Sequence, residues 1–263
     1  MSTLLIRNAR YIVSCDDYDT LHENVNLFIR DGVVEYIGPK LCHAEAAIDA
    51  SRMAVYPGLI NTHHHLYQIF SRNLPQVQRL ELFPWLVALY EVWKNLNEDV
   101  VYHASLTGMG ELLKTGCTTC FDHHYVFPDR AGDLIAAQFR AADTLGMRFH
   151  ASRGSMDLSK KDGGLPPDSV VQPIDAILAD SERLVKVWHD DSRYAMHRVA
   201  LAPCSPFSVS GDLLRESARL ARSLGVRLHT HLAETRDEEK FTLEKFGMRP
   251  LAYMESLGWV GND

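Results

Sequence analysis

The order of apolar segments after Met53 constrains the fold of this chain more than any other sequence feature. Short apolar segments that suit β-strands alternate there with longer segments of helical periodicity. The predicted strands span residues 55–61, 117–122, 147–152, 199–202 and 226–231. The predicted helices between them span residues 97–116, 129–145, 174–188 and 212–224. Repeated strand–helix units pair into a parallel sheet through right-handed crossovers, so the sequence predicts an α/β fold, either a (β/α) barrel or a doubly wound sheet.

The first 55 residues have a different character, because strand-like alternation occurs there without helices between the strands. The predicted strands span residues 4–13, 25–30 and 33–37. The last two flank Asp31-Gly32, a strong hairpin signal, since glycine tolerates the positive φ that a tight turn needs. We expect residues 1–55 to form a small β-module and residues 56–263 to form a separate strand–helix domain.

The number of strand–helix units bears on how much of a barrel this chain supplies. A complete barrel has eight units and typically about 250 residues. Residues 56–263 supply five predicted strands. We therefore expect this part to be the first part of a barrel, and the chain to be a fragment.

Charge and composition narrow the classes of partner. The 263 residues carry a net charge of −7, from 27 Lys and Arg against 34 Asp and Glu, and the charges are interspersed. This balance argues against nucleic-acid binding through phosphate contacts. The sequence has neither a signal-peptide pattern nor an apolar run long enough to cross a bilayer, so we expect no membrane partner. Its five scattered cysteines suggest reduced thiols and a cytoplasmic location.

Three consecutive histidines follow the first predicted strand of the strand–helix part. Side chains alternate faces along a strand, so His63 and His65 point the same way and His64 points opposite. Two imidazoles at the carboxyl end of a barrel strand can chelate one borderline cation such as Zn²⁺ or Fe²⁺. The alternative is a chance histidine cluster on a surface loop.

A second histidine pair ends the last predicted strand. His229 and His231 share one face of it, and His231 is the preferred third ligand because it lies nearer the carboxyl end. Glu234 follows three residues later, where the loop can fold its carboxylate over the metal. A carboxylate that is not a ligand can shuttle protons there. The alternative for Glu234 is a solvated residue in the first turn of the next helix.

Two sequence patterns carry a family resemblance. They are Pro57-Gly58-x-x-Asn61-x-His63-x-His65 and His231-x-x-Glu234. With them the chain resembles the amidohydrolase superfamily, and more narrowly its branch of cytosine, guanine, S-adenosylhomocysteine and hydroxyatrazine aminohydrolases. Segments 61–73, 123–128, 153–156 and 163–167 are most similar to 8-oxoguanine deaminases. The resemblance implies a (β/α)8 TIM-type barrel with a small N-terminal β-sandwich that C-terminal strands complete.

The resemblance also implies a mononuclear metal site and the reaction it serves. His63, His65 and His231 would hold one divalent ion, zinc or alternatively iron, and Glu234 would be the proton shuttle. The family's strand-six histidine and strand-eight aspartate would lie past residue 263. The implied activity is hydrolytic deamination of a purine-type base, 8-oxoguanine to urate plus ammonia. In it, hydroxide attacks the amine-bearing ring carbon after Glu234 protonates an adjacent ring nitrogen.

Other readings of the chain remain open at this point. A triazine (hydroxyatrazine-like) aminohydrolase, a guanine or cytosine deaminase, or another cyclic amidine or amide hydrolase could use the same scaffold. A non-catalytic metal-binding protein is a further alternative. A Rossmann-type oxidoreductase is disfavoured, because no glycine-rich phosphate loop follows an early strand. The expected partners are a small heterocyclic substrate and, by resemblance, a second copy of the chain in a homo-oligomer.

Candidate substrate-binding residues follow the predicted strands. Gln68 could hydrogen-bond a purine edge, with an exposed loop amide as the alternative. Of His123 and His124, one faces the pocket and the other is structural, since neighbouring strand residues alternate. Arg153 could bind a ring carbonyl through its planar fork, and pairing with an acid is the alternative. The apolar segment 66–95 could cap the pocket, form a subunit contact or pack locally as a short helix.

Overall fold

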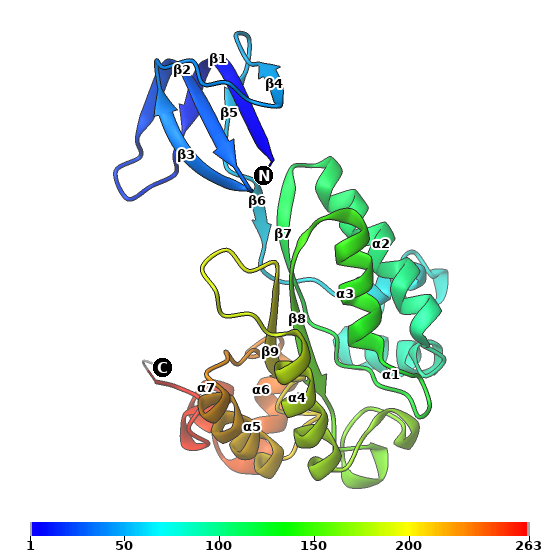
Figure 1. Cartoon of the computed structure of the whole chain (residues 1–263). Coiled ribbons are helices and arrows are strands. Elements are labelled where there is room, and N and C mark those ends of the chain that lie inside the picture. The colour runs from blue at the N-terminus through cyan, green and yellow to red at the C-terminus, as the bar shows by residue number, and fades with distance from the viewer. Residues whose placement is uncertain (1, 262–263) are drawn as a thin grey trace. The chain divides into compact units, whose positions relative to one another are not determined.

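The computed structural model describes residues 2–261, which divide into two compact units between Leu59 and Ile60. The first unit is a five-stranded sheet (Figure 1). Its strands are β1 (Thr3–Val13), β2 (Leu21–Arg30), β3 (Val33–Gly38), β4 (Ala46–Asp49) and β5 (Ala54–Val55). They follow the order β3-β2-β1-β4, and β5 pairs with β1.

The predicted hairpin of this unit joins β2 to β3. Asp31 and Gly32 both have positive φ, 47° and 79°, as the tight turn between antiparallel strands requires. One face of the sheet buries a small apolar cluster of Ala9, Ile12, Leu27 and Ala50. This cluster of four buried residues is a small core for a five-stranded sheet.

The second unit is built on a four-stranded sheet in the order β6-β7-β8-β9. Its strands are β6 (Leu59–Asn61), β7 (Cys117–Asp122), β8 (Arg148–Ser155) and β9 (His197–Pro203). Its α-helices are α1 (Leu82–Trp93), α2 (Glu98–Lys114), α3 (Leu134–Leu145), α4 (Ile174–Trp188), α5 (Gly211–Leu224), α6 (Arg236–Phe246) and α7 (Pro250–Ser256). β7, β8 and β9 pair in parallel, so their carboxyl ends meet at one edge, where the loops that follow them gather.

The predicted fifth strand is reduced to a single parallel bridge between Leu201 and Leu228. Backbone bonds join Leu201 N to the Arg227 carbonyl and His229 N to the Leu201 carbonyl, both at 3.0 Å. The next ladder bond would come from Pro203, which has no N–H. His231 N donates to the Cys204 carbonyl instead, at 3.0 Å, so the segment still runs beside β9 as far as the site.

Local signals set the helix ends. The Asn97 side chain accepts a hydrogen bond from Val100 N and caps α2, and glycines with left-handed φ end α3 and α5. α3 begins at Leu134, later than predicted, because Arg130 and Gly132 have left-handed φ and Asp133 is the N-cap. Part of segment 66–95 is a short helix, α1, whose buried residues join the main core.

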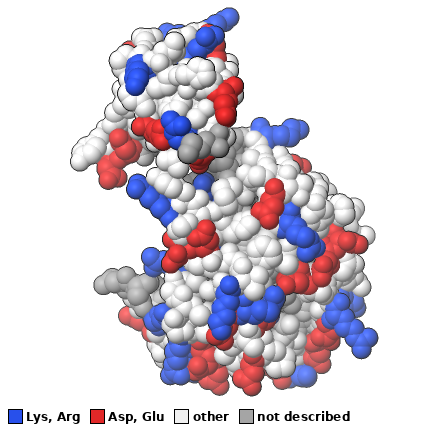
Figure 2. Space-filling view, in the orientation of Figure 1, with Lys and Arg blue, Asp and Glu red and all other residues white. Residues whose placement is uncertain are grey.

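Surface charge and helix length are the two features that concern nucleic-acid and membrane partners. On the face shown in Figure 2, basic and acidic side chains of the second unit are interspersed and form no basic stripe. Among residues 2–261, no helix combines the length and the apolarity needed to span a membrane.

The close approach of β7 and β8 at their carboxyl ends depends on Gly154. Its N–H donates to the His124 carbonyl at 2.9 Å. A Cβ at this position would overlap that carbonyl oxygen and lie 2.6 Å from Tyr125 Cα, both backbone atoms. We expect Gly154→Ala to lower the free energy of unfolding by about 1–3 kcal/mol, since overpacking against backbone cannot be relieved by a side-chain rotation. Urea denaturation of the variant and of Gly110→Ala, whose Cβ would meet open space, measures this. Equal midpoints would contradict it.

Candidate metal centre

Four histidines from three segments converge at the carboxyl edge of the sheet. His63 and His65 follow β6, His123 follows β7, and His231 follows the segment that runs beside β9. One ring nitrogen from each lies within 4.8 Å of the other three. The sequence analysis places His63, His65 and His231 together as ligands, and the structure brings the three together with His123 as a fourth member.

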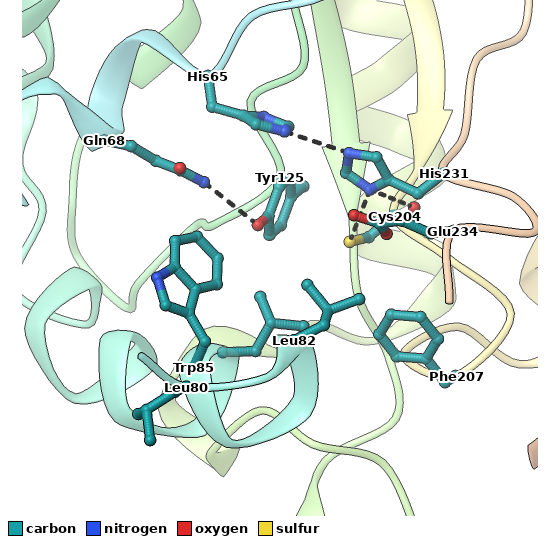
Figure 3. A pocket seen from close by; sticks show the side chains of 11 residues that line it. His65, Gln68, Leu80, Leu82, Trp85, Tyr125, Cys204, Phe207, His231 and Glu234 are labelled. Carbon is teal, nitrogen blue, oxygen red and sulfur yellow. Dashed lines mark hydrogen bonds between the residues drawn. The ribbon is translucent and has the colours of Figure 1, made fainter. Parts of the chain in front are cut away.

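The hydrogen bonds of His65 and His231 define where each ring carries its proton. His65 Nδ1 lies 2.7 Å from the carbonyl of His123, and His231 Nδ1 lies 3.0 Å from the carbonyl of Cys204. Because a carbonyl only accepts, both protons are on Nδ1, and both Nε2 atoms carry lone pairs. These Nε2 atoms are 3.2 Å apart (Figure 3). Two facing lone pairs repel unless a cation lies between them, so this pair fits a metal ion.

His123 supports the same conclusion and differs from its prediction as a substrate contact. Its Nε2–H donates to the Ala202 carbonyl at 3.1 Å, which leaves a lone pair on Nδ1. That Nδ1 atom is buried and has no hydrogen-bond partner. An orphaned buried acceptor beside three other imidazoles suits a role at the cation rather than at a substrate ring.

His124 lies on the other side of the backbone. Its Nε2–H donates to the Val126 carbonyl at 2.9 Å, and its ring packs against Tyr67 and Phe127. Burial lowers the pKa of His124 to about 3, so the ring is neutral. It does not line the cavity, which makes it the structural member of the predicted pair.

His229, the rival ligand, pairs with His63. Its Nε2 lies 3.0 Å from His63 Nδ1, and the two rings are stacked with centroids 5.2 Å apart. It is outside the group of four, although it lies beside one of its members. The preference for His231 therefore agrees with the geometry.

The electrostatics of the cluster keep its rings neutral. Burial, followed by repulsion from His231, lowers the pKa of His65 well below its ordinary value. Burial and the neighbouring His63 and His229 lower the pKa of His231 to about 4. Neutral imidazole is the form that binds a metal, so the site is ligand-competent at neutral pH.

A cavity of about 400 Å³ opens beside His65 and His231. Figure 3 shows its two walls, one polar and one apolar. The polar side carries Gln68, Tyr125, Cys204 and Glu234 beside the two histidines, and the apolar side carries Leu80, Leu82, Trp85, Leu86 and Phe207. Segment 66–95 thus caps this cavity, as one of its predicted roles requires. The sequence analysis did not single out Tyr125, whose signal was its place directly after the His123-His124 pair.

Glu234 lies on the cavity wall between His231 and α6. It precedes the helix, whose N-cap is Thr235, so it is not a first-turn residue. Partial burial and the nearby Glu238 carboxylate raise the pKa of Glu234. A carboxyl group with a raised pKa at the edge of a metal-competent site is suited to take up and release protons.

Arg153 is placed away from the cavity. Its guanidinium is buried over the Phe127 ring, and it donates to Asp180 at 2.6 Å, to Gln172 at 2.8 Å and to the Gly154 carbonyl. Each of the three guanidinium nitrogens donates to a protein group. The predicted substrate contact of Arg153 is therefore corrected: Arg153 pairs with an acid, which was the alternative.

Burial raises the pKa of the Cys204 thiol on the cavity wall to about 12, so this residue is a neutral thiol.

Comparison with known proteins gives the family. The Amidohydrolase family model matches residues 54–262. The chain belongs to the amidohydrolase family. The 8-oxoguanine deaminase of Pseudomonas aeruginosa is 46% identical over 99% of this chain and 58% of its own length. The hydroxydechloroatrazine ethylaminohydrolase of Pseudomonas sp. (strain ADP) is 41% identical over 100% of this chain and 57% of its own length.

A solved structure extends the comparison. The atrazine chlorohydrolase from Arthrobacter aurescens TC1, complexed with zinc, aligns with a TM-score of 0.90 and 32% identity, covering 97% of this chain and 58% of its own. This confirms the predicted α/β, TIM-type barrel fold and the predicted family. The chain spans a little over half the length of these relatives.

Proposed function

We propose that this chain provides the metal site and proton shuttle of a hydrolytic deaminase of a purine-type base, and that the reaction is 8-oxoguanine plus water to urate plus ammonia. The observation that carries the proposal is the pair of Nε2 lone pairs of His65 and His231, 3.2 Å apart, with Glu234 on the wall of the adjoining cavity. The relative that is 46% identical and named 8-oxoguanine deaminase supports this substrate.

The proposed metal is one zinc ion, and His63, His65 and His231 would hold it. Carbonyl groups fix the rings of His65 and His231, and such outer hydrogen bonds orient ligands in metal sites. His123 is a further donor of the same cluster. When bound, the ion supplies hydroxide near neutral pH by lowering the pKa of water. The zinc complex of the Arthrobacter relative supports this metal, with iron as the alternative.

Glu234 would handle the protons of the reaction. Its carboxylate takes a proton as water adds to C2 of the ring and passes it to the ring nitrogen beside C2. A second transfer moves the proton of the added hydroxyl to the exocyclic nitrogen, so ammonia leaves as the C2–N bond breaks and the C2=O bond of urate forms. The raised pKa of Glu234 supports this role, because a shuttle works best when its pKa lies nearer to the operating pH.

Gln68 would read an N–H edge of the substrate. Its Nε2 lies 3.3 Å from Tyr67 Oη and 3.5 Å from Tyr125 Oη, so the two phenol oxygens take its donors. Its carbonyl oxygen is then the group left to meet a ring N–H. Burial keeps both phenols neutral by raising their pKa, so they hold this arrangement at any ordinary pH. The apolar wall with Trp85 suits the face of a flat ring.

Triazine aminohydrolysis is the second candidate function. The hydroxydechloroatrazine ethylaminohydrolase, 41% identical, and the atrazine chlorohydrolase structure favour it. An aminotriazine needs the same metal and the same carboxylate, so the residues at the metal do not separate the two substrates. Guanine, cytosine and other cyclic amidines or amides belong to the same comparison.

The test is ammonia release by the full-length, zinc-loaded protein from 8-oxoguanine, guanine, cytosine and hydroxyatrazine in parallel. We expect the highest kcat/KM for 8-oxoguanine, with urate as the second product. A higher value for hydroxyatrazine would replace the purine by the triazine. No ammonia release from any of the four compounds by a zinc-replete protein would overturn the deaminase proposal.

The location, oligomeric state and partners of the protein are also proposals. We place the protein in the cytoplasm as a homo-oligomer that acts on a small heterocyclic substrate, without a nucleic-acid or membrane partner. The interspersed charges argue against a nucleic-acid partner, and the scattered cysteines support the cytoplasmic location. The homo-oligomer rests on the family resemblance alone.

A further inference from the structure

The loop that carries Glu234 contains a left-handed residue that is not glycine. Ala233 has φ of 56°, a conformation that costs free energy for any residue with a Cβ. It lies between His231 at the histidine cluster and Thr235, the N-cap of α6. Something must hold this turn, because a relaxed Ala233 would turn the backbone of Glu234 in a different direction.

Glu238 holds the turn from inside the protein. Its side chain is buried at the first turn of α6. Oε1 accepts the N–H of Ala233 at 3.0 Å, and Oε2 accepts the N–H of Glu234 at 2.7 Å. Both oxygens of one carboxylate therefore bind two consecutive backbone groups, which fixes the peptide between them.

This arrangement exceeds ordinary helix capping. In a capping box the glutamate three residues after the N-cap bonds to the N–H of the N-cap residue, here Thr235. Thr235 Oγ1 does accept the N–H of Glu238, at 3.4 Å. The Glu238 carboxylate, however, reaches one and two residues further back, to the residue on the cavity wall and the left-handed residue before it.

We propose that Glu238 is the positioning residue of the proton shuttle: it fixes the backbone of Glu234 so that the Glu234 carboxylate faces the cavity. The proposal rests on the proposed function of Glu234. Glu238 does not line the cavity and touches no reacting group, so it acts through Glu234. It therefore has to affect turnover without contributing to substrate binding or to the metal site.

The charge of Glu238 gives this role a second consequence. Repulsion from Glu238 adds to burial in raising the pKa of Glu234. The other titratable groups around Glu234 are His231 before it in the loop, His65 after β6, Tyr125 after β7, Cys204 after β9 and Tyr90 on α1. Burial keeps both tyrosines and the thiol neutral, and the two histidines are neutral at ordinary pH. Glu238 is thus the negative charge that acts on Glu234 in this part of the structure.

The test compares Glu238→Gln with Asp237→Asn in the full-length, zinc-loaded protein. Glutamine keeps the volume of Glu238 but replaces one acceptor oxygen by a donor, which faces a backbone N–H, and it removes the charge. Asp237→Asn removes the same charge from an exposed neighbour in the same helical turn. We expect Glu238→Gln to lower kcat by about 10²-fold, because misplacing a reacting group by about 1 Å has this effect, with KM and zinc content unchanged.

The pH profile separates positioning from mere helix stabilisation. Removing the Glu238 charge lowers the pKa of Glu234, so the acidic limb of the kcat profile moves to lower pH. Asp237→Asn should change neither kcat nor this limb. Ala233→Gly combined with Glu238→Gln should recover part of the lost kcat, because glycine adopts the left-handed turn freely.

The outcomes are distinct. Wild-type kcat in Glu238→Gln, or a loss of zinc in step with activity, would overturn the proposal, and so would an unmoved acidic limb. If Glu238→Gln does not fold, Ala233→Gly in its background still tests it: a folded double variant with full kcat overturns it. Glu234→Gln, measured beside these variants, shows whether the shuttle itself exists. Wild-type activity there would refute the proposed function rather than the role of Glu238.

Discussion

Replacing Glu234 by glutamine is expected to lower kcat for 8-oxoguanine by about 10²–10⁴-fold, the range that a positioned general acid–base contributes. Glutamine has the shape of the carboxylate but cannot take a proton from water or return it to the ring. Glu234 lies outside the group of four histidines, so the variant should keep its zinc. Steady-state kinetics with zinc quantified on the same sample measures both quantities.

Glu239→Gln is the matched control for this prediction. Glu239 is a glutamate in the first turn of α6, close to Glu234 in the sequence, but its carboxylate pairs with Arg249 on the surface. The Glu239→Gln variant should turn over 8-oxoguanine at the wild-type rate. If Glu234→Gln lost zinc along with activity, Glu234 would be a ligand. If it kept its activity, the proton transfers would need another group, and the cavity offers none with a raised carboxyl pKa besides Glu234 among its lining residues.

The fold was predictable where one local signal decides an element. Asn97 caps α2 and Gly146 ends α3 as the sequence indicates, because these effects act within one helical turn. The strand predicted at 226–231 failed for a reason that lies on its neighbour. Pro203 in β9 cannot donate the bond that would extend the ladder past Leu228. A strand pattern carries no information about its partner's missing donors.

The site residues, too, were predictable only where a local sequence pattern decides their position. Strand alternation predicts that His63 and His65 share a face, and the structure brings both into one cluster. The choice between His123 and His124 depends on the carbonyl that each ring meets: that of Ala202, 79 residues away, for His123, and that of Val126, two residues away, for His124. Arg153 was equally undetermined, since its acid partner Asp180 comes 27 residues later on another element. Glu238 has no sequence signal beyond a capping box, because its role depends on the left-handed turn at Ala233.

Loss of one imidazole of the facing pair gives the other large effect that we expect. His65→Ala removes a nitrogen whose lone pair faces His231 Nε2 at 3.2 Å, and it also frees the His123 carbonyl that orients the ring. Removing only an outer partner of a metal ligand weakens binding by about 10–100-fold, so removing the ligand should weaken zinc binding by more than this. Activity at limiting zinc should fall in proportion, and excess zinc should restore part of it.

His64→Ala is the control, because His64 belongs to the same run of three histidines but lies outside the cluster of four. Titration with a chromophoric zinc chelator measures the affinity of both variants, and thermal unfolding with and without chelator measures the linked stability. Zinc that binds only the native state raises the free energy of unfolding by RT ln(1 + [Zn]/Kd), so the chelator should lower the Tm of His64→Ala as much as that of the wild type, and that of His65→Ala less. Equal zinc affinity in His65→Ala and His64→Ala would mean that His65 is not a ligand, and that the ion is held by His63, His123 and His231 without His65.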